Sequence, residues 1–322
     1  MLKLLTIFSF IFFLSFKLFA SETTGIITTI QPITSLVSAV IGNTGKTISL
    51  IPTEISPHEY KLKPSDIKKL QNGNIIFYVS DHLETSITKV FENLPKNIKT
   101  INLMEDTGIK HLAIRDNEAW ERHDHHDGHE DHNNHDHDKH AKKNDDHDDH
   151  EKEDDVHIWL SPDNAVKIIK KINKELSLFF PENAKTYDQN ANQMIKKINQ
   201  LKIELKNELS GIKDKPYIVF HDAYQYFETS FDLNAVGSIA LDGDIASSPK
   251  QISFIKDKIV KFKASCVFQE PQFDSKLVKI VAEGTNAQIG TLDPLGLNIK
   301  SGENFYLQLL KNMAKSLKDC LG

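Results

Sequence analysis

The densest concentration of metal-binding chemistry in the sequence lies in residues 121–155. This segment holds ten of the 15 histidines of the chain, together with eleven aspartates and four glutamates. Imidazole is the commonest protein ligand for borderline metals such as zinc, and short histidine-rich tracts are typical of metal binding. A solvated, charged linker is the alternative, but uncharged imidazole contributes little to solubility. The predicted metal-binding residues of the segment are His123, His125, His126, His129, His132, His135, His137, His140, His147 and His150.

The same segment has too few apolar side chains to form a core. Such a composition cannot offset the entropy lost on ordering, so we expect residues 121–155 to be a disordered loop.

The negative charge of the chain, whose formal net value is -6, is concentrated in this segment. It gives no support to nucleic-acid binding, which needs clustered lysine and arginine. A local negative field beside many imidazoles attracts cations instead, and we interpret the loop as an auxiliary metal site of low affinity.

Five histidines lie outside this segment, namely His58, His82, His111, His157 and His221. His58 and His221 each follow an expected strand, as does Asp293. In open α/β sheets ligands gather beyond the carboxyl ends of the strands, so these residues are expected to converge in one cleft. His157 lies where the chain becomes apolar again after the histidine-rich segment. Three neutral imidazoles and a carboxylate form a tetrahedral set suited to zinc.

Each of these four candidates also has a purely structural alternative. His58 could be a histidine that caps a turn, and His157 could be a core histidine that is hydrogen-bonded to backbone. His221 could form a surface pair with Asp222, and Asp293 could form a turn before Pro294. We prefer the metal site because all four residues lie at strand exits or loop junctions. His82 also follows an expected strand, so spacing alone does not exclude it. We assign His111 to the surface.

Short β-rich runs alternate with amphipathic helical stretches on both sides of the histidine-rich segment. In the first half we expect strands at 25–30, 46–51, 74–79 and 100–103, and a helix that is capped by Ser65 and runs through Leu70. In the second half we expect strands at 217–220, 233–236, 266–269 and 288–292, and helices at 248–262, 275–282 and 305–317. This alternation is typical of βαβ units on a mostly parallel sheet. The predicted fold is α/β, with two lobes, each a mostly parallel sheet flanked by helices, and a cleft for metal between them.

Residues 181–209 repeat apolar side chains at intervals of three to four, which predicts one long helix. At ~1.5 Å per residue this helix spans about 40 Å. We interpret it as a connection between the two lobes, because a coiled coil needs a stricter heptad over more turns. The predicted organisation is a signal peptide at 1–20, an N-terminal lobe at 21–175, a connecting helix at 176–211 and a C-terminal lobe at 212–322.

The first 20 residues are typical of a secretory signal peptide. Lys3 provides the positive start, residues 4–16 form an uncharged apolar run, and Ala20 precedes the expected cleavage point. No cysteine lies near the cut, so we expect a soluble exported protein without a lipid anchor. Cys266 and Cys320 suggest one disulfide in an oxidising compartment, with two separate buried thiols as the alternative.

Five ordered motifs, which cover nearly the whole mature chain, resemble the metal-binding receptors that feed ABC importers, and in detail the periplasmic zinc-uptake receptors. The motifs are Pro57-His-Glu-Tyr with Lys63-Pro-Ser-Asp66, His157-Ile-Trp-Leu-Ser-Pro162, Val219-Phe-His-Asp-Ala-Tyr224, Phe268-Gln-Glu-Pro-Gln-Phe273 and Gly290-Thr-Leu-Asp-Pro-Leu-Gly296. The histidine-rich loop and the cysteine pair belong to the same pattern. The resemblance implies two α/β lobes linked by one long, rather rigid helix, with the metal held between the lobes.

The resemblance also implies a function: capture of Zn²⁺ as transported ligand and delivery to the membrane permease of an ABC importer, by a periplasmic monomer that is not an enzyme. It carries over His58, His157 and His221 as ligands, with Asp293 at the fourth position. Some zinc receptors have a glutamate directly before the first histidine, where this chain has Pro57. Asp293, the neighbouring Glu59 and water therefore all stay open as the fourth ligand.

Two other functions stay as alternatives. A manganese or iron receptor of the same fold is one, although related manganese receptors generally carry a carboxylate where this chain has His221, and imidazole favours zinc. A zinc hydrolase with Glu59 or Glu270 as base is the other, since three ligands and an open position also describe catalytic zinc. The sequence contains no HExxH helix and no nucleophile elbow, which argues against a hydrolase.

Overall fold

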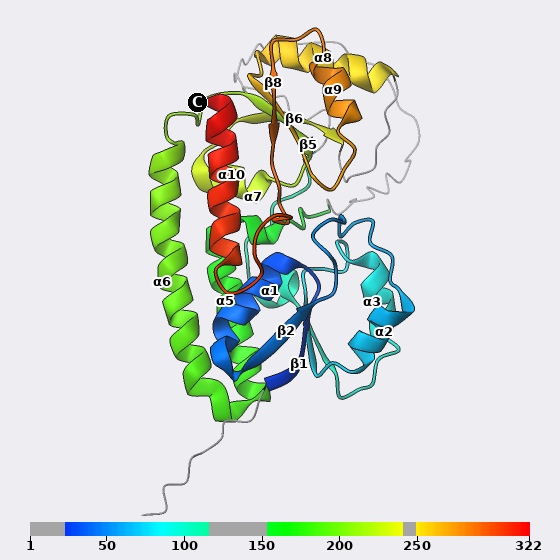
Figure 1. Ribbon diagram of the computed structural model, residues 1–322, viewed down its shortest axis with the longest axis vertical. Coiled ribbons are helices and arrows are strands. Elements are labelled where there is room, and N and C mark those ends of the chain that lie inside the picture. The colour runs from blue at the N-terminus through cyan, green and yellow to red at the C-terminus, as the bar shows by residue number, and fades with distance from the viewer. Residues whose placement is uncertain (1–22, 116–152, 241–248) are drawn as a thin grey trace, which may run out of the picture.

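The uninterrupted apolar runs of the sequence form the central strands of two parallel sheets. β3 (Ile75–Tyr78) and β5 (Tyr217–His221) are buried along their whole length, as expected for parallel strands covered on both faces. The computed structural model describes residues 23–115, 153–240 and 249–322 (Figure 1). The expected signal peptide and the ten histidines of the histidine-rich segment lie outside the described residues.

The N-terminal sheet has the strand order β2-β1-β3-β4, with every pairing parallel. Its other strands are β1 (Thr23–Thr28), β2 (Gly45–Ser49) and β4 (Lys99–Asn102). The helices of this part are α1 (Gln31–Ile41), α2 (Pro64–Gln71), α3 (Thr85–Phe91), α4 (Leu103–Asp106) and α5 (Pro162–Phe179). The expected cap at Ser65 is wrong: α2 begins at Pro64, and the Asp66 carboxylate accepts the backbone N–H of Lys63 at 3.1 Å. Proline at the first helical position explains the earlier start.

The C-terminal sheet repeats the same arrangement, with the order β6-β5-β7-β8 and parallel pairing throughout. Its other strands are β6 (Ala235–Ala240), β7 (Cys266–Gln269) and β8 (Gln288–Thr291). The helices are α7 (Gln225–Phe231), α8 (Pro249–Phe262), α9 (Lys276–Ala282) and α10 (Phe305–Leu321). Each lobe therefore places its second strand at one edge and its first strand beside its third. The predicted α/β fold with two mostly parallel sheets is confirmed.

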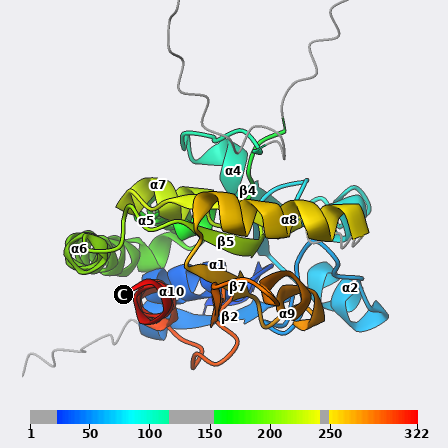
Figure 2. The same ribbon diagram turned by 90° about the horizontal axis from the view of Figure 1, so that it is seen from above.

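The predicted long helix is α6 (Ala184–Leu209), preceded by a short 3-10 turn at Pro181–Asn183. Its buried side chains follow the predicted spacing along one face and include Tyr187, Met194 and Leu205. Figures 1 and 2 show α6 beside α10, and α6 runs along both lobes. The domain limits given above stay a prediction, and α5 runs through position 176. Among the described helices, none combines the length and the apolar character needed to cross a bilayer.

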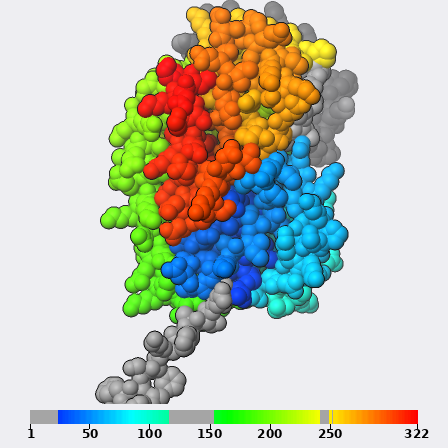
Figure 3. Space-filling view, viewed as in Figure 1, coloured from blue at the N-terminus to red at the C-terminus, as the bar shows by residue number. Residues whose placement is uncertain are grey.

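Side chains and backbone of the two lobes are tied together beside the long helix. Trp159 is fully buried and its Nε1 donates to the carbonyl of Pro294 at 2.9 Å. The Tyr306 hydroxyl at the start of α10 donates in turn to the carbonyl of Trp159 at 2.8 Å. Ser35 of α1 donates to the carbonyl of Gly302 at 2.8 Å. On the face in Figure 3, the stretch before α10 and α10 itself lie over both lobes.

The predicted disulfide between Cys266 and Cys320 is present, with a Cα–Cα distance of 6.2 Å. It joins the buried strand β7 to the last turn of α10 and closes a loop of 54 positions. Closing a loop of this length is expected to stabilise the fold by roughly 4 kcal/mol, mainly by restricting the unfolded chain.

We expect the double variant Cys266→Ala, Cys320→Ala to lose roughly 4 kcal/mol of unfolding free energy, because the unfolded chain regains the entropy of the open loop. Urea titration followed by circular dichroism measures this loss. Wild-type protein treated with dithiothreitol is the control and should show a similar loss. An unchanged urea midpoint in both would contradict this account of the disulfide.

Candidate metal centre

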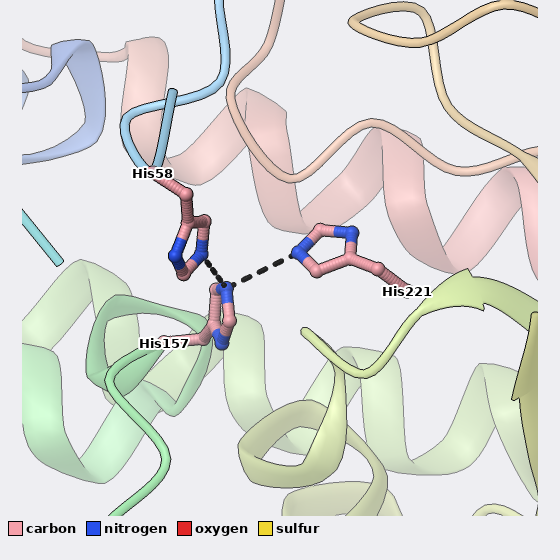
Figure 4. Close-up of side chains that lie close together, drawn as sticks. All are labelled: His58, His157 and His221. Atoms are coloured by element: carbon pink, nitrogen blue, oxygen red, sulfur yellow. Dashed lines mark hydrogen bonds between the residues drawn. The ribbon is translucent and has the colours of Figure 1, made fainter. Parts of the chain in front are cut away.

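Three histidines from distant parts of the chain meet between the lobes (Figure 4). His58 lies in the loop between β2 and α2, His157 precedes a short 3-10 turn before α5, and His221 is the last residue of β5. The Nε2 atom of His157 lies 3.1 Å from Nε2 of His58 and 3.2 Å from Nε2 of His221. One ring nitrogen of each histidine lies within 4.8 Å of the others. They form the only such group of three or more His, Cys, Asp or Glu side chains in the described part of the chain.

The strand order of the C-terminal sheet explains how His221 is positioned. β5 and β7 are parallel neighbours, so their carboxyl ends lie side by side. His221 ends β5, and Glu270 directly follows β7. This is the point where the strand order reverses direction, which is where ligands bind in open α/β sheets.

Two buried carboxylates contact the Nδ1 atoms of two imidazole rings, on the side of each ring away from the cluster. Asp155 Oδ1 lies 2.7 Å from Nδ1 of His157 and also accepts the backbone N–H of that residue at 2.9 Å. Glu270 Oε1 lies 2.6 Å from Nδ1 of His221. An ionised carboxylate only accepts hydrogen bonds, so it places the ring proton on Nδ1 and leaves Nε2 as a bare acceptor. Carboxylates hold histidine ligands in the same way in metal sites.

Burial and neighbouring charges shift the three imidazoles in different directions. Burial lowers the pKa of His58 and of His157 well below the ordinary value, and the neighbouring histidines lower both further. Burial also acts to lower the pKa of His221, but attraction and hydrogen bonding by Glu270 outweigh it, so the net pKa is raised. Burial raises the pKa of Asp155 to about 7. A cation bound to the Nε2 atoms would favour the ionised form of this carboxyl.

The cavity around the three histidines is small and mostly apolar. Its volume is about 10 Å³, and its lining includes Pro57, Trp159, Phe273 and Leu295. His157 and His221 are only 4% and 3% exposed. A space of this size holds about one water molecule, so a metal ion must lose most of its hydration shell to enter.

The structure does not bring Asp293 into this cluster. Its carboxylate accepts the backbone N–H groups of Leu295, Gly296 and Leu297 at 3.0, 2.8 and 2.6 Å. It also accepts a hydrogen bond from Nε2 of Gln272 at 3.0 Å. Four donors thus occupy the carboxylate, which is the turn-forming arrangement that was the alternative to metal binding.

The remaining candidates also lie outside the cluster. Glu59 and His82 are exposed to solvent. The side chain of His111, which we assigned to the surface, is 29% exposed and lies 2.6 Å from Oδ2 of Asp154. This pair lies at the base of the histidine-rich segment, where Ala113 and Asp154 form an isolated antiparallel bridge.

Asp155 and Arg115 were not among the predicted site residues, and Glu270 was named only as the base of the alternative hydrolase. Asp155 and Glu270 orient two of the histidines through their Nδ1 atoms. Arg115 donates to the carboxylate of Asp222 at 2.9 Å and to Glu228 at 2.6 Å. The strand-exit rule that selected His221 also applies to Glu270, which follows β7. No comparable sequence signal identifies Arg115, because its partners are more than 100 positions away.

Comparison with known proteins agrees with this geometry. The family model described as "Zinc-uptake complex component A periplasmic" matches residues 26–320. The chain belongs to this family. A relative from Brucella abortus (strain 2308), "High-affinity zinc uptake system protein ZnuA", is 43% identical over 310 residues, which cover 94% of this chain and 93% of that protein.

A second relative and a solved structure are also similar to this chain. The ZnuA protein of Haemophilus ducreyi is 38% identical over 296 residues, covering 92% of this chain and 93% of that one. A solved structure, "Crystal structure of ZnuA", has a TM-score of 0.74 at 22% identity and covers 92% of this chain and 98% of that chain. At this identity the structural likeness shows the fold alone. Membership of the family rests on the family model and on the two relatives.

We expect Asp155→Asn to weaken zinc binding about tenfold to hundredfold, because the neutral amide holds the Nδ1–H group of His157 less firmly. Competition with a chromophoric zinc chelator measures the change. Asp154→Asn is the matched control, since this neighbouring carboxylate pairs with His111 outside the centre, and its affinity should equal that of wild type. Equal affinities for all three proteins would show that Asp155 does not position the ligand.

Zinc affinity should fall as pH falls through the raised pKa of His221, which lies above the ordinary value of about 6.5. A proton and the ion compete for the same Nε2 atom, whereas His58 and His157 have lowered pKa values and are already neutral there. Because zinc binding displaces one proton, zinc affinity should fall about tenfold for each pH unit below that pKa. Chelator competition between pH 8.5 and 5.5 tests this. Glu270→Gln should move the onset to lower pH, and a flat profile would contradict histidine ligation.

Proposed function

We propose that this protein is an exported receptor that captures Zn²⁺ between His58, His157 and His221 and delivers it to the membrane permease of an ABC importer. The observation that carries the proposal is the convergence of three Nε2 atoms while carboxylates occupy the Nδ1 side of two rings. When His157 and His221 are neutral and donate from Nδ1, their Nε2 atoms are two acceptors 3.2 Å apart, which repel one another. A cation between them turns this repulsion into attraction.

The geometry favours zinc among the possible cations. Zinc–nitrogen bonds of about 2.0–2.1 Å in a tetrahedral site place ligand nitrogens about 3.3–3.4 Å apart. The two shorter Nε2 separations, 3.1 and 3.2 Å, are close to this value. Manganese prefers carboxylate and water, whereas Asp155 and Glu270 each hold a ring through one oxygen and do not belong to the group of three ligand atoms. We propose water at the fourth position, because Asp293 and Glu59 make other contacts or face solvent.

Membership of the family supports the proposed delivery and location. The names of the relatives describe zinc uptake, and the family description is periplasmic. We propose a soluble periplasmic monomer without a lipid anchor and without enzymatic activity. The two lobes would present the ion to the permease, and a cytoplasmic ATPase would drive import. The ten histidines between positions 123 and 150 would gather or sense zinc as an auxiliary site of lower affinity. The expectation of a disordered loop over all of 121–155 is wrong at its end, where Asp155 is buried against His157.

Calorimetric titration with zinc should show one tight site in wild type and loss of that site in the triple variant His58→Ala, His157→Ala, His221→Ala. The matched control is His82→Ala, His111→Ala, which removes two histidines outside the cluster and should retain the tight site. Each variant is then expressed in a bacterium that lacks its own zinc receptor and carries the permease of this chain. Growth in zinc-depleted medium should fail with the triple variant alone. A tight site that survives in the triple variant would refute the ligand assignment.

Deletion of residues 121–150 should leave the tight site unchanged and remove only the additional, weaker zinc equivalents, because the three cluster histidines lie outside the deleted segment. The same calorimetric titration measures affinity and stoichiometry together. Loss of the tight site in this deletion variant would show that the segment contributes to the main site.

A further inference from the structure

Gln272 is one of the residues that line the cavity around the three histidines, and one of the two polar atoms of its amide lacks a partner. Its Nε2 donates to the carbonyl of Thr53 at 2.9 Å and to Oδ1 of Asp293 at 3.0 Å. Its Oε1 is buried and has no hydrogen-bond partner among the residues that the structure describes. Buried acceptors are nearly always paired in native proteins, so this oxygen requires an explanation.

The contacts of Gln272 fix the direction in which its amide faces. The carbonyl of Thr53 and the carboxylate of Asp293 only accept hydrogen bonds, so they require the NH₂ group. Turning the amide over would place Oε1 against two other acceptors and lose both bonds. The oxygen is therefore held away from Thr53 and Asp293, in the residue that lines the histidine cavity.

We propose that Gln272 Oε1 accepts a hydrogen bond from the water that completes the coordination of the ion bound by the three histidines. This inference rests on the proposed function. Three imidazoles leave one position of a zinc tetrahedron open, and no fourth His, Cys, Asp or Glu joins the cluster among the described residues. Amide oxygens suit magnesium, calcium and manganese as direct ligands. Next to zinc, the oxygen of Gln272 acts through the bound water.

Gln272 contacts residues of both lobes. Thr53 belongs to the loop that also carries His58, and Asp293 follows β8 in the other lobe. The bound ion would thus be connected through one water and one amide to both sides of the cleft.

The test uses the full chain loaded with cobalt chloride, because the visible absorption of tetrahedral Co²⁺ reports the ligand at the fourth position. We expect Gln272→Met to shift the pH at which this absorption changes, because the bound water loses its hydrogen-bond acceptor, and to weaken zinc binding about tenfold in a chelator competition. The matched control is Gln269→Met. The Gln269 amide donates to Oγ1 of Thr291 outside the cavity, so this variant should match wild type in both measurements.

An absorption of Gln272→Met with the same pH dependence as that of wild type would overturn the inference even if the affinity falls. A role limited to holding Thr53 and Asp293 would weaken binding without changing the protonation of the bound water. If the methionine variant does not fold, Gln272→Asn draws the amide back by one methylene group and has the same two outcomes. Wild-type protein that binds neither ion would instead refute the three-histidine site itself.

Discussion

The centre depends on two buried hydrogen bonds between carboxylates and imidazoles. Asp155 and Glu270 hold Nδ1 of His157 and His221 at 2.7 and 2.6 Å, which leaves the Nε2 atoms as acceptors that face one another. Hydrogen bonds that involve charged groups contribute about 1.5–3 kcal/mol each, enough to fix the orientation of both rings. When both rings are neutral, the Nε2 lone pairs of His157 and His221 therefore face one another 3.2 Å apart, and a cation between them would be attracted to both.

The rest of the fold holds these two carboxylate–imidazole pairs close to each other across the cleft. Asp155 and His157 belong to the segment that enters α5, whereas His221 and Glu270 end two adjacent strands of the other sheet. Trp159 ties the first segment to the backbone of Pro294. Arg115 joins the base of the histidine-rich segment to Asp222, the residue after His221. Together with α6 and α10, these contacts oppose large relative motion of the lobes.

Much of the fold follows from local sequence patterns, and the exceptions have physical reasons. The strands and α6 were predictable because apolar runs and helical periodicity are strong signals. Helix α1 was not among the predicted helices; ten of its eleven residues are buried and it carries no charged residue, so no charged, solvent-facing side marks it in the sequence. His58 and His221 were found because strand exits in parallel sheets converge, and His157 because the chain becomes apolar again at that point. Asp293 also satisfies that rule, but the positive φ of 76° at Gly296 allows a turn in which three backbone N–H groups meet its carboxylate.

The most direct test of the account is anomalous diffraction at the zinc edge from crystals of the zinc-loaded protein. The account predicts one strong anomalous peak at about 2.0–2.1 Å from Nε2 of His58, His157 and His221. In the same map, Nδ1 of His157 and of His221 should remain bonded to Asp155 and Glu270. A peak bound through Nδ1, or anomalous density found only away from these three histidines, would contradict the account.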